Sequence, residues 1–240
     1  RAGHPVYFIT FAPEPVEGQT LLDVARAQAH FIAEVVRRHP RCGCKPAIIG
    51  NCQAGWAVAA LASVRGDIMG PIVLNGAPLS YWAGSPKQNP MRYAGGLQGG
   101  AWMAAFASDL SGDRFDGAFL VDNFERLNLG NTLWGKYYNL YANVDTERDR
   151  FLEFERWWGG YFRMTGEEIV AIVENLFVGN KLARDEVVME DIPVHLRNIT
   201  SPIVIFASWG DNITPPQQAL DWIIDVWGSE KALVKAGRTI

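Results

Sequence analysis

Residues 48–56 read IIGNCQAGW, and this stretch decides the fold. The apolar run PAIIG (46–50) is typical of a buried strand, and residues 54–65 are typical of a helix. Cys52 stands on the turn between them, with Gly50 before it and Ala54 and Gly55 after it. Because small residues allow a strand and the helix that follows it to approach closely, the stretch predicts a strand–turn–helix elbow with a thiol at its tip.

Three other segments are typical of buried strands, namely PVYFITF (5–11), PIVLNGAPL (71–79) and SPIVIFASWGD (201–211). Helices are predicted over residues 20–39, where Thr20 and Asp23 suit the N-terminus, and over residues 215–227, which follow the last of these strands. Alternating strands and helices predict an α/β fold, in which a parallel sheet carries helices on both faces.

About 120 residues of a different character separate the last two predicted strands. They contain most of the tryptophan and tyrosine, with helical patterns such as 166–179 and no clear strand. We interpret them as a helical cap inserted above the carboxyl edge of the sheet. The predicted organisation is a first part of the core over 1–79, a cap over 80–195 and a second part of the core over 196–240. GGLQGG (95–100) follows no strand, so it predicts a hinge rather than a dinucleotide site, and no cofactor is expected.

Composition and charge exclude several classes of function. The net charge of −4, without a basic stripe, argues against nucleic-acid binding. No apolar run reaches the roughly 18 residues that a membrane span needs. The chain opens directly on a strand-like run with no leader peptide, so we expect a cytoplasmic protein and a sequence that is part of a longer one. The sequence is compatible with either a monomer or a homo-oligomer.

Three cysteines do not form a disulfide framework. Cys42 and Cys44, in RCGCKP, lack a nearby histidine or second cysteine pair, so a metal site is not predicted. We interpret both as reduced thiols on a loop.

Cys52 is the candidate nucleophile. The elbow places it at the N-terminus of the following helix, where the positive end of the dipole favours a thiolate. The backbone N–H of Gln53 would point at the oxyanion that develops during acyl transfer. The alternative is a buried core cysteine, which is the commonest fate of a free thiol.

A nucleophilic thiol needs a base and an acidic group to orient that base. Asp211 follows the strand 201–211 in GDNITPP and is the candidate acid, although it could instead cap the next helix. The histidines are His4, His30, His39 and His195. None is expected at the carboxyl edge of the sheet, so we expect the catalytic histidine beyond Ile240, after one more strand.

Together these stretches resemble the polyhydroxyalkanoate synthase group of the α/β-hydrolase superfamily, and most closely a related bacterial family labelled 3-hydroxyalkanoate synthetase. The group's G-x-C-x-G-G box is similar to residues 50–55, with Ala54 in place of a glycine. Its D-x-I-x-P element matches residues 211–215, and residues 175–206 are similar throughout. Asn212 departs from the histidine that often follows the aspartate in that group.

The resemblance implies an acyltransferase in which Cys52 attacks a hydroxyacyl thioester, such as an acyl-CoA, or an ester. A hydrolase of esters or polyesters is the alternative enzyme, since both reactions pass through an acyl-cysteine. The aromatic cap would suit either by excluding water, although ordinary packing also accounts for such residues. A non-catalytic interaction module or inactive fragment is the third hypothesis, because an incomplete sheet exposes strand edges.

Overall fold

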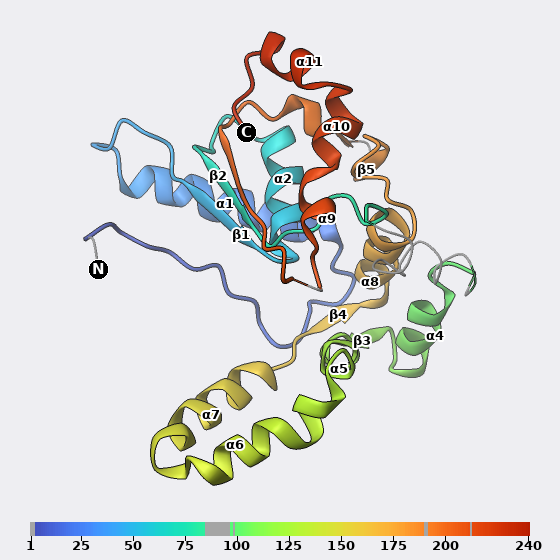
Figure 1. Cartoon of the computed structure of the whole chain (residues 1–240). Coiled ribbons are helices and arrows are strands. Elements are labelled where there is room, and N and C mark those ends of the chain that lie inside the picture. Colours follow the sequence, from blue (N-terminus) through green and yellow to red (C-terminus); the bar gives the residue numbers. More distant parts are fainter. Residues whose placement is uncertain (1–2, 85–96, 98, 190–191, 212) are drawn as a thin grey trace.

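A computed structural model of the chain describes residues 3–84, 97, 99–189, 192–211 and 213–240 (Figure 1). Asn212 and much of the predicted hinge at 95–100 therefore lie outside the described residues.

The centre of the molecule is a parallel sheet in the order β1 (Ile48–Asn51), β2 (Ile72–Asn75) and β7 (Ile203–Phe206). The register pairs Ile48 with Ile72 and Ile72 with Ile203. Strands β2 and β7 lie within predicted strands, and β1 extends one residue beyond the predicted strand 46–50. The helices α1 (Leu21–Arg38) and α2 (Ala54–Val64) match the predicted ones to within one residue at each end. A capping box of Thr20 and Asp23 begins α1, as the sequence suggested. The class of fold is thus confirmed as a mixture of helices with a parallel sheet.

One face of this sheet is covered. Ile72 and Leu74 of β2 are fully buried against α2, and α1 packs against α2 in turn. The other face is open, since Ile49 is 69% exposed, Val204 55% and Phe206 62%. The prediction of helices on both faces is therefore wrong for the described residues. The connection from β1 to β2 places α2 on one face, whereas the connection from β2 to β7 leaves the sheet to build other elements.

The segment 5–11 forms no strand, which also corrects the sequence prediction. Val6 is 71% exposed and Phe8 87%, and the segment runs extended along the outside of the molecule (Figure 1). A strand requires a partner for its backbone groups. A contact of this segment with the rest of the chain is made by a side chain rather than by the backbone: the hydroxyl of Tyr7 and Nε2 of His39 are hydrogen-bonded at 2.8 Å.

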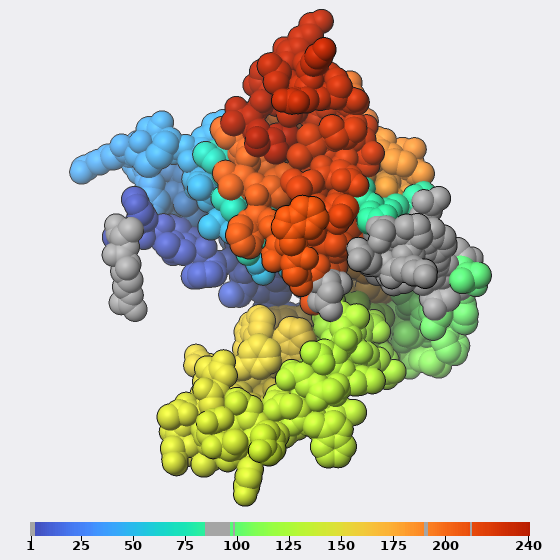
Figure 2. Space-filling view, viewed as in Figure 1, coloured from blue at the N-terminus to red at the C-terminus, as the bar shows by residue number. Residues whose placement is uncertain are grey.

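Within the described residues, the chain between β2 and β7 forms helices and short strands, and residues 118–158 project from the rest as a lobe (Figure 2). The described elements before residue 166 are α4 (Trp102–Leu110), β3 (Arg114–Asp116), α5 (Ala118–Arg126), the π-helix η1 (Asn131–Gly135), α6 (Lys136–Ala142), α7 (Val144–Trp158) and β4 (Arg163–Thr165). Strands β3 and β4 pair antiparallel, so the prediction of a cap without strands is wrong. The sequence did not predict these two strands, because three residues are too few to show an alternating pattern.

The second half of this connection returns to the main core. It comprises α8 (Gly166–Ile172), the π-helix η2 (Val173–Phe177), the antiparallel pair β5 (Val187–Met189) and β6 (Ile192–Val194), and the 3₁₀ turn η3 (Leu196–Asn198). Leu176, Val187 and Val194 belong to the same buried cluster as Ile72 and Leu74. After β7 come α9 (Pro216–Leu220), α10 (Trp222–Trp227) and α11 (Glu230–Lys235). In the described ranges no helix is both long and apolar enough to cross a membrane.

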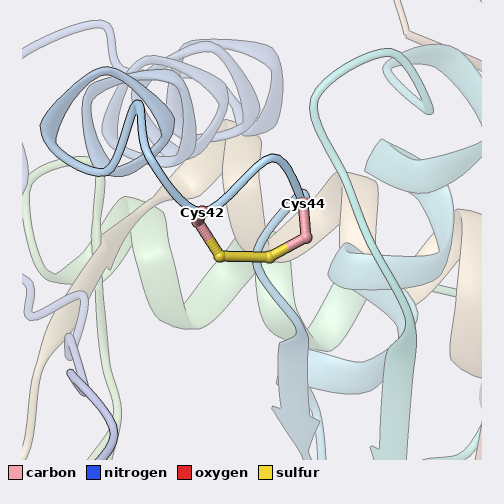
Figure 3. The surroundings of a disulfide bond; sticks show 2 residues. All are labelled: Cys42 and Cys44. Carbon is pink, nitrogen blue, oxygen red and sulfur yellow. A yellow bond between two sulfur atoms is a disulfide. The ribbon is translucent and has the colours of Figure 1, made fainter.

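Cys42 and Cys44 are joined by a disulfide on the loop between α1 and β1 (Figure 3). The expectation of two reduced loop thiols is therefore wrong in this structure. Gly43 between them has φ +61°, which turns the chain back on itself. Because of this turn the two Cα atoms lie only 5.2 Å apart, within the range that a disulfide spans.

Candidate active site at the cysteine elbow

Cys52 occupies the turn between β1 and α2, where the strand–turn–helix was predicted. Its φ is +53°, a left-handed conformation that is uncommon for any residue other than glycine. The backbone N–H of Cys52 donates to the carbonyl of Asn75 at 2.8 Å, and its own carbonyl accepts from the N–H of Gly55 at 2.9 Å. Two backbone hydrogen bonds thus hold the strained residue at the carboxyl edge of the sheet.

Two glycines make this turn possible. A Cβ atom at Gly50 would lie 2.7 Å from the Cα of Gly55, and one at Gly55 would lie 2.1 Å from the Cβ of Ala77. Both distances are shorter than side-chain atoms tolerate, so only glycine lets β1, α2 and the segment after β2 approach this closely. Ala54, by contrast, is exposed, so a small side chain is not needed there for packing.

Burial raises the pKa of the Cys52 thiol, and the negative charge of Asp211 raises it further. A hydrogen bond from the backbone of Gln53 opposes both effects without overcoming them. The pKa of Cys52 is therefore shifted upward, opposite to the direction predicted from its place at the N-terminus of α2. This hydrogen bond brings the backbone N–H of Gln53 to the Cys52 sulfur.

The side chain of Gln53 is held from two directions. Its Oε1 accepts a hydrogen bond from the indole Nε1 of Trp56 at 3.1 Å and another from the hydroxyl of Tyr81 at 2.9 Å. Tyr81 is almost fully buried, which raises the pKa of its phenol, and the hydrogen bond to Gln53 opposes this rise without overcoming it. Tyr81 therefore lies next to the elbow and stays a neutral hydrogen-bond donor.

Asn180 holds the backbone around Tyr81. Its Oδ1 accepts from the backbone N–H of Tyr81 at 2.7 Å and from that of Trp82 at 3.4 Å. Asn180 is buried and has φ +49°, a region that asparagine enters more readily than most residues. The sequence did not predict roles for Tyr81 and Asn180. Only the fold brings Tyr81 to Gln53, and Asn180 to Tyr81.

Asp211 lies near the same edge of the sheet. A Cβ atom at Gly76, the residue after β2, would be 3.7 Å from its Oδ2. Its Oδ1 accepts from the backbone N–H groups of Ile213 and Thr214, at 2.9 and 3.0 Å. Asp211 thus caps the loop before α9, whereas the helix itself begins at Pro215 without a side-chain cap, so the alternative role as a helix cap is not seen. Its Oδ2 faces the end of β2.

None of the four histidines bonds to Cys52 or Asp211. His39 contacts Tyr7, and His195 lies just before η3 with its backbone carbonyl accepting from Asn198. His30 lies on α1 and His4 on the extended N-terminal segment. The structure therefore brings together the predicted nucleophile, oxyanion donor and acid, and adds no imidazole to them.

A separate apolar cavity of roughly 600 Å³ lies between α1, α2 and the hairpin β5–β6. Trp56 lines it, but Cys52 does not. The cavity therefore touches the elbow only through the indole that bonds Gln53.

The fold and the site describe an α/β protein with a cysteine on a strand–helix elbow. All 240 residues match the family described as "Protein of unknown function (DUF3141)", and the chain belongs to that family. A protein of Rhizobium meliloti, described as an uncharacterized protein in the ackA 5′ region, is 57% identical over the whole chain. The poly(3-hydroxyalkanoate) polymerase subunit PhaC of Haloferax mediterranei is 29% identical over 84 residues, or 34% of the chain.

The chain spans only part of these relatives. It covers 33% of the length of the Rhizobium protein and 17% of the Haloferax polymerase subunit.

Proposed function

We propose that this protein is an acyltransferase of hydroxyacyl thioesters that uses Cys52 as its nucleophile. The observation that carries the proposal is the backbone of Cys52, held at φ +53° on a glycine-lined elbow with the Gln53 N–H at its sulfur. A strained conformation fixed by neighbouring contacts is a frequent mark of a functional residue. The partial similarity to a polyhydroxyalkanoate polymerase subunit supports the choice of hydroxyacyl substrates.

In the proposed reaction the Cys52 thiolate adds to the thioester carbonyl, and the Gln53 N–H donates to the oxyanion. Collapse of this intermediate breaks the carbon–sulfur bond of the substrate and releases its thiol, which leaves the acyl group on Cys52. The hydroxyl of a second hydroxyacyl group then attacks the acyl-cysteine, forms the new ester bond and returns the thiol of Cys52. Each step moves one proton, which a general base must accept and return.

The proposal includes a histidine supplied from outside these 240 residues. Burial raises the pKa of the Cys52 thiol, and none of the four histidines in this chain bonds to it. Asp211 would orient that base through Oδ2, the oxygen that the loop does not use.

The test uses the full-length natural protein with 3-hydroxybutyryl-CoA, and separately with p-nitrophenyl butyrate. We expect release of CoA, a hydroxyacyl adduct on Cys52 detectable by mass spectrometry, and an oligomeric ester product. The Cys52→Ala variant should lose the adduct and retain the fold, because it removes one atom from a half-buried position.

The other outcomes separate the alternatives. Release of free hydroxy acid without oligomer would replace the transferase with a hydrolase. No acyl adduct on Cys52 with either substrate would overturn both enzymes and favour a non-catalytic role.

A further inference from the structure

The disulfide Cys42–Cys44 lies apart from the cysteine elbow. It sits on the loop before β1, at the amino edge of the sheet, whereas Cys52 follows β1 at the carboxyl edge (Figures 1 and 3). The length of the strand separates them, so neither sulfur of the pair takes part in the chemistry of Cys52.

This disulfide contributes little to holding the fold. Only one residue separates the cysteines, and a cross-link stabilises a chain mainly through the length of the loop that it closes. The loop is anchored by other bonds: the N–H of Gly70 donates to the carbonyl of Pro46 at 3.0 Å, and Nζ of Lys45 donates to the carbonyl of Gly66 at 2.9 Å. These bonds fix the entry to β1 without involving either sulfur.

Both cysteines are exposed, and a basic residue stands on each side of the pair in the sequence. Arg41 and Lys45 flank the pair in sequence, and Cys42, Gly43 and Cys44 are all open to solvent. Positive neighbours favour a thiolate, the form that attacks a disulfide and the form that leaves it. Exchangeable disulfides differ from structural ones in three ways: an external thiol can reach them, they do not hold the fold, and their leaving thiolate is stabilised.

We propose that Cys42 and Cys44 form a redox-active pair that exchanges with low-molecular-weight thiols such as glutathione. An external thiolate attacks one sulfur of the pair, breaks the Cys42–Cys44 bond and forms a mixed disulfide, while the released cysteine sulfur takes a proton. A second external thiol attacks the mixed disulfide, which leaves two cysteine thiols and one external disulfide. The two external thiols supply the two electrons that the pair gains.

The experiment uses the full chain with Cys52→Ala, so that the pair contains the only remaining thiols. The protein is equilibrated without oxygen in buffers of different ratios of reduced to oxidised glutathione, quenched with acid and labelled with N-ethylmaleimide. We expect intact-protein mass spectra to show two labels at the reducing end and none at the oxidising end, with both labels lost together between them. Two labels at every ratio, or none at every ratio, would overturn the proposal.

The matched control adds Cys42→Ser to the same chain. It should keep its single label at ratios where the parent has already lost both, because a lone thiol can only form a mixed disulfide. If the control loses its label at the same ratios as the parent, the loss reflects glutathione adducts and the intramolecular pair is refuted. Since Cys52 is absent from both proteins, neither outcome depends on the proposed acyl transfer.

Discussion

Cys52 combines a strained backbone with a thiol whose pKa is raised by its surroundings. The elbow aims the sulfur at the edge of the sheet, but the burial that comes with the tight turn raises the pKa of the thiol, and Asp211 adds to this effect. Positioning and activation are therefore separate requirements at this site. The elbow meets the first, and a nearby cation or base would have to meet the second.

This separation predicts the pH dependence of Cys52 alkylation in the 240-residue chain. The thiolate is the reactive form, and a raised pKa means that less of it exists at neutral pH. With the Cys42–Cys44 disulfide intact, iodoacetamide should label Cys52 slowly at pH 7. The rate should rise toward a midpoint above that of free cysteine, as measured by peptide mass spectrometry over a series of pH values.

Asp211→Asn provides the control for this measurement. Asparagine keeps an oxygen for the N–H groups of Ile213 and Thr214 but removes the negative charge, so the midpoint for Cys52 should move down. A midpoint for the parent at or below that of free cysteine would show that the thiol is already activated within this chain.

The hydrogen bond from Tyr81 to Gln53 gives a second prediction for a single residue. Tyr81→Phe removes the hydroxyl donor and leaves the ring packed against Phe177, with centroids 4.9 Å apart. Because Gln53 Oε1 still accepts from Trp56, the free energy of unfolding should fall by only about 1 kcal/mol. Urea denaturation measures the change.

Tyr141→Phe is the matched control, because Tyr141 is 82% exposed and its hydroxyl is in solvent. Its unfolding midpoint should equal that of the parent. If Tyr81→Phe also leaves the midpoint unchanged, the hydrogen bond to Gln53 contributes nothing to stability.

At the scale of elements, the elbow depends on how closely β1, α2 and the segment after β2 approach one another. Gly55→Ala would place a Cβ atom 2.1 Å from the Cβ of Ala77 and force these elements apart. Overpacking of this kind typically costs about 1–3 kcal/mol, and we expect a loss in that range by urea denaturation.

Gly130→Ala tests whether the loss at Gly55 is steric. Gly130 has a helical φ of −60°, and the nearest atom to a Cβ there would be 3.9 Å away. This variant should be neutral or slightly stabilising. Equal losses at Gly55 and Gly130 would mean that the close approach at the elbow is not what requires glycine.

Elements with a local signal were predictable from the sequence. The glycines around Cys52 specified the elbow, and Thr20 with Asp23 specified the start of α1. The segment 5–11 has the composition of a strand, but pairing depends on a neighbour that composition does not reveal. Likewise β3 and β4 each have three residues, and they exist only because the fold brings residues 114 and 165 together.

The site shows the same limit. Cys52, Gln53 and Asp211 could be named because the turn residues around them are visible in the sequence. Tyr81 and Asn180 could not, because their contacts join residues 99 positions apart. The direction of the Cys52 pKa also depends on burial, which no local pattern reports.

At the scale of the whole molecule, α5, η1, α6 and α7 form an arm that stands away from the sheet (Figures 1 and 2). None of the residues in these four elements is buried, and Trp134, Tyr138 and Trp157 are each at least 70% exposed. The arm is held by its own contacts, such as Trp158 Nε1 to Glu125 Oε1 at 2.6 Å and Lys136 Nζ to Glu155 Oε1 at 3.0 Å. Packing in the main core therefore does not explain the aromatic residues of this region.

This independence predicts that the arm can be removed. Asp116 of β3 and Arg163 of β4 are paired across the antiparallel ladder, so replacing residues 117–162 by Asn-Gly should close them as a two-residue hairpin. Amide hydrogen exchange in β2 reports the stability of the core, because β2 is the central strand. We expect the protection of β2 after the deletion to equal that of the parent.

Trp222→Ala is the control that should weaken the core. It empties a fully buried position and should lower the free energy of opening in β2 by about 3–5 kcal/mol in the same assay. Loss of protection in β2 on removing the arm would instead show that arm and core fold as one unit.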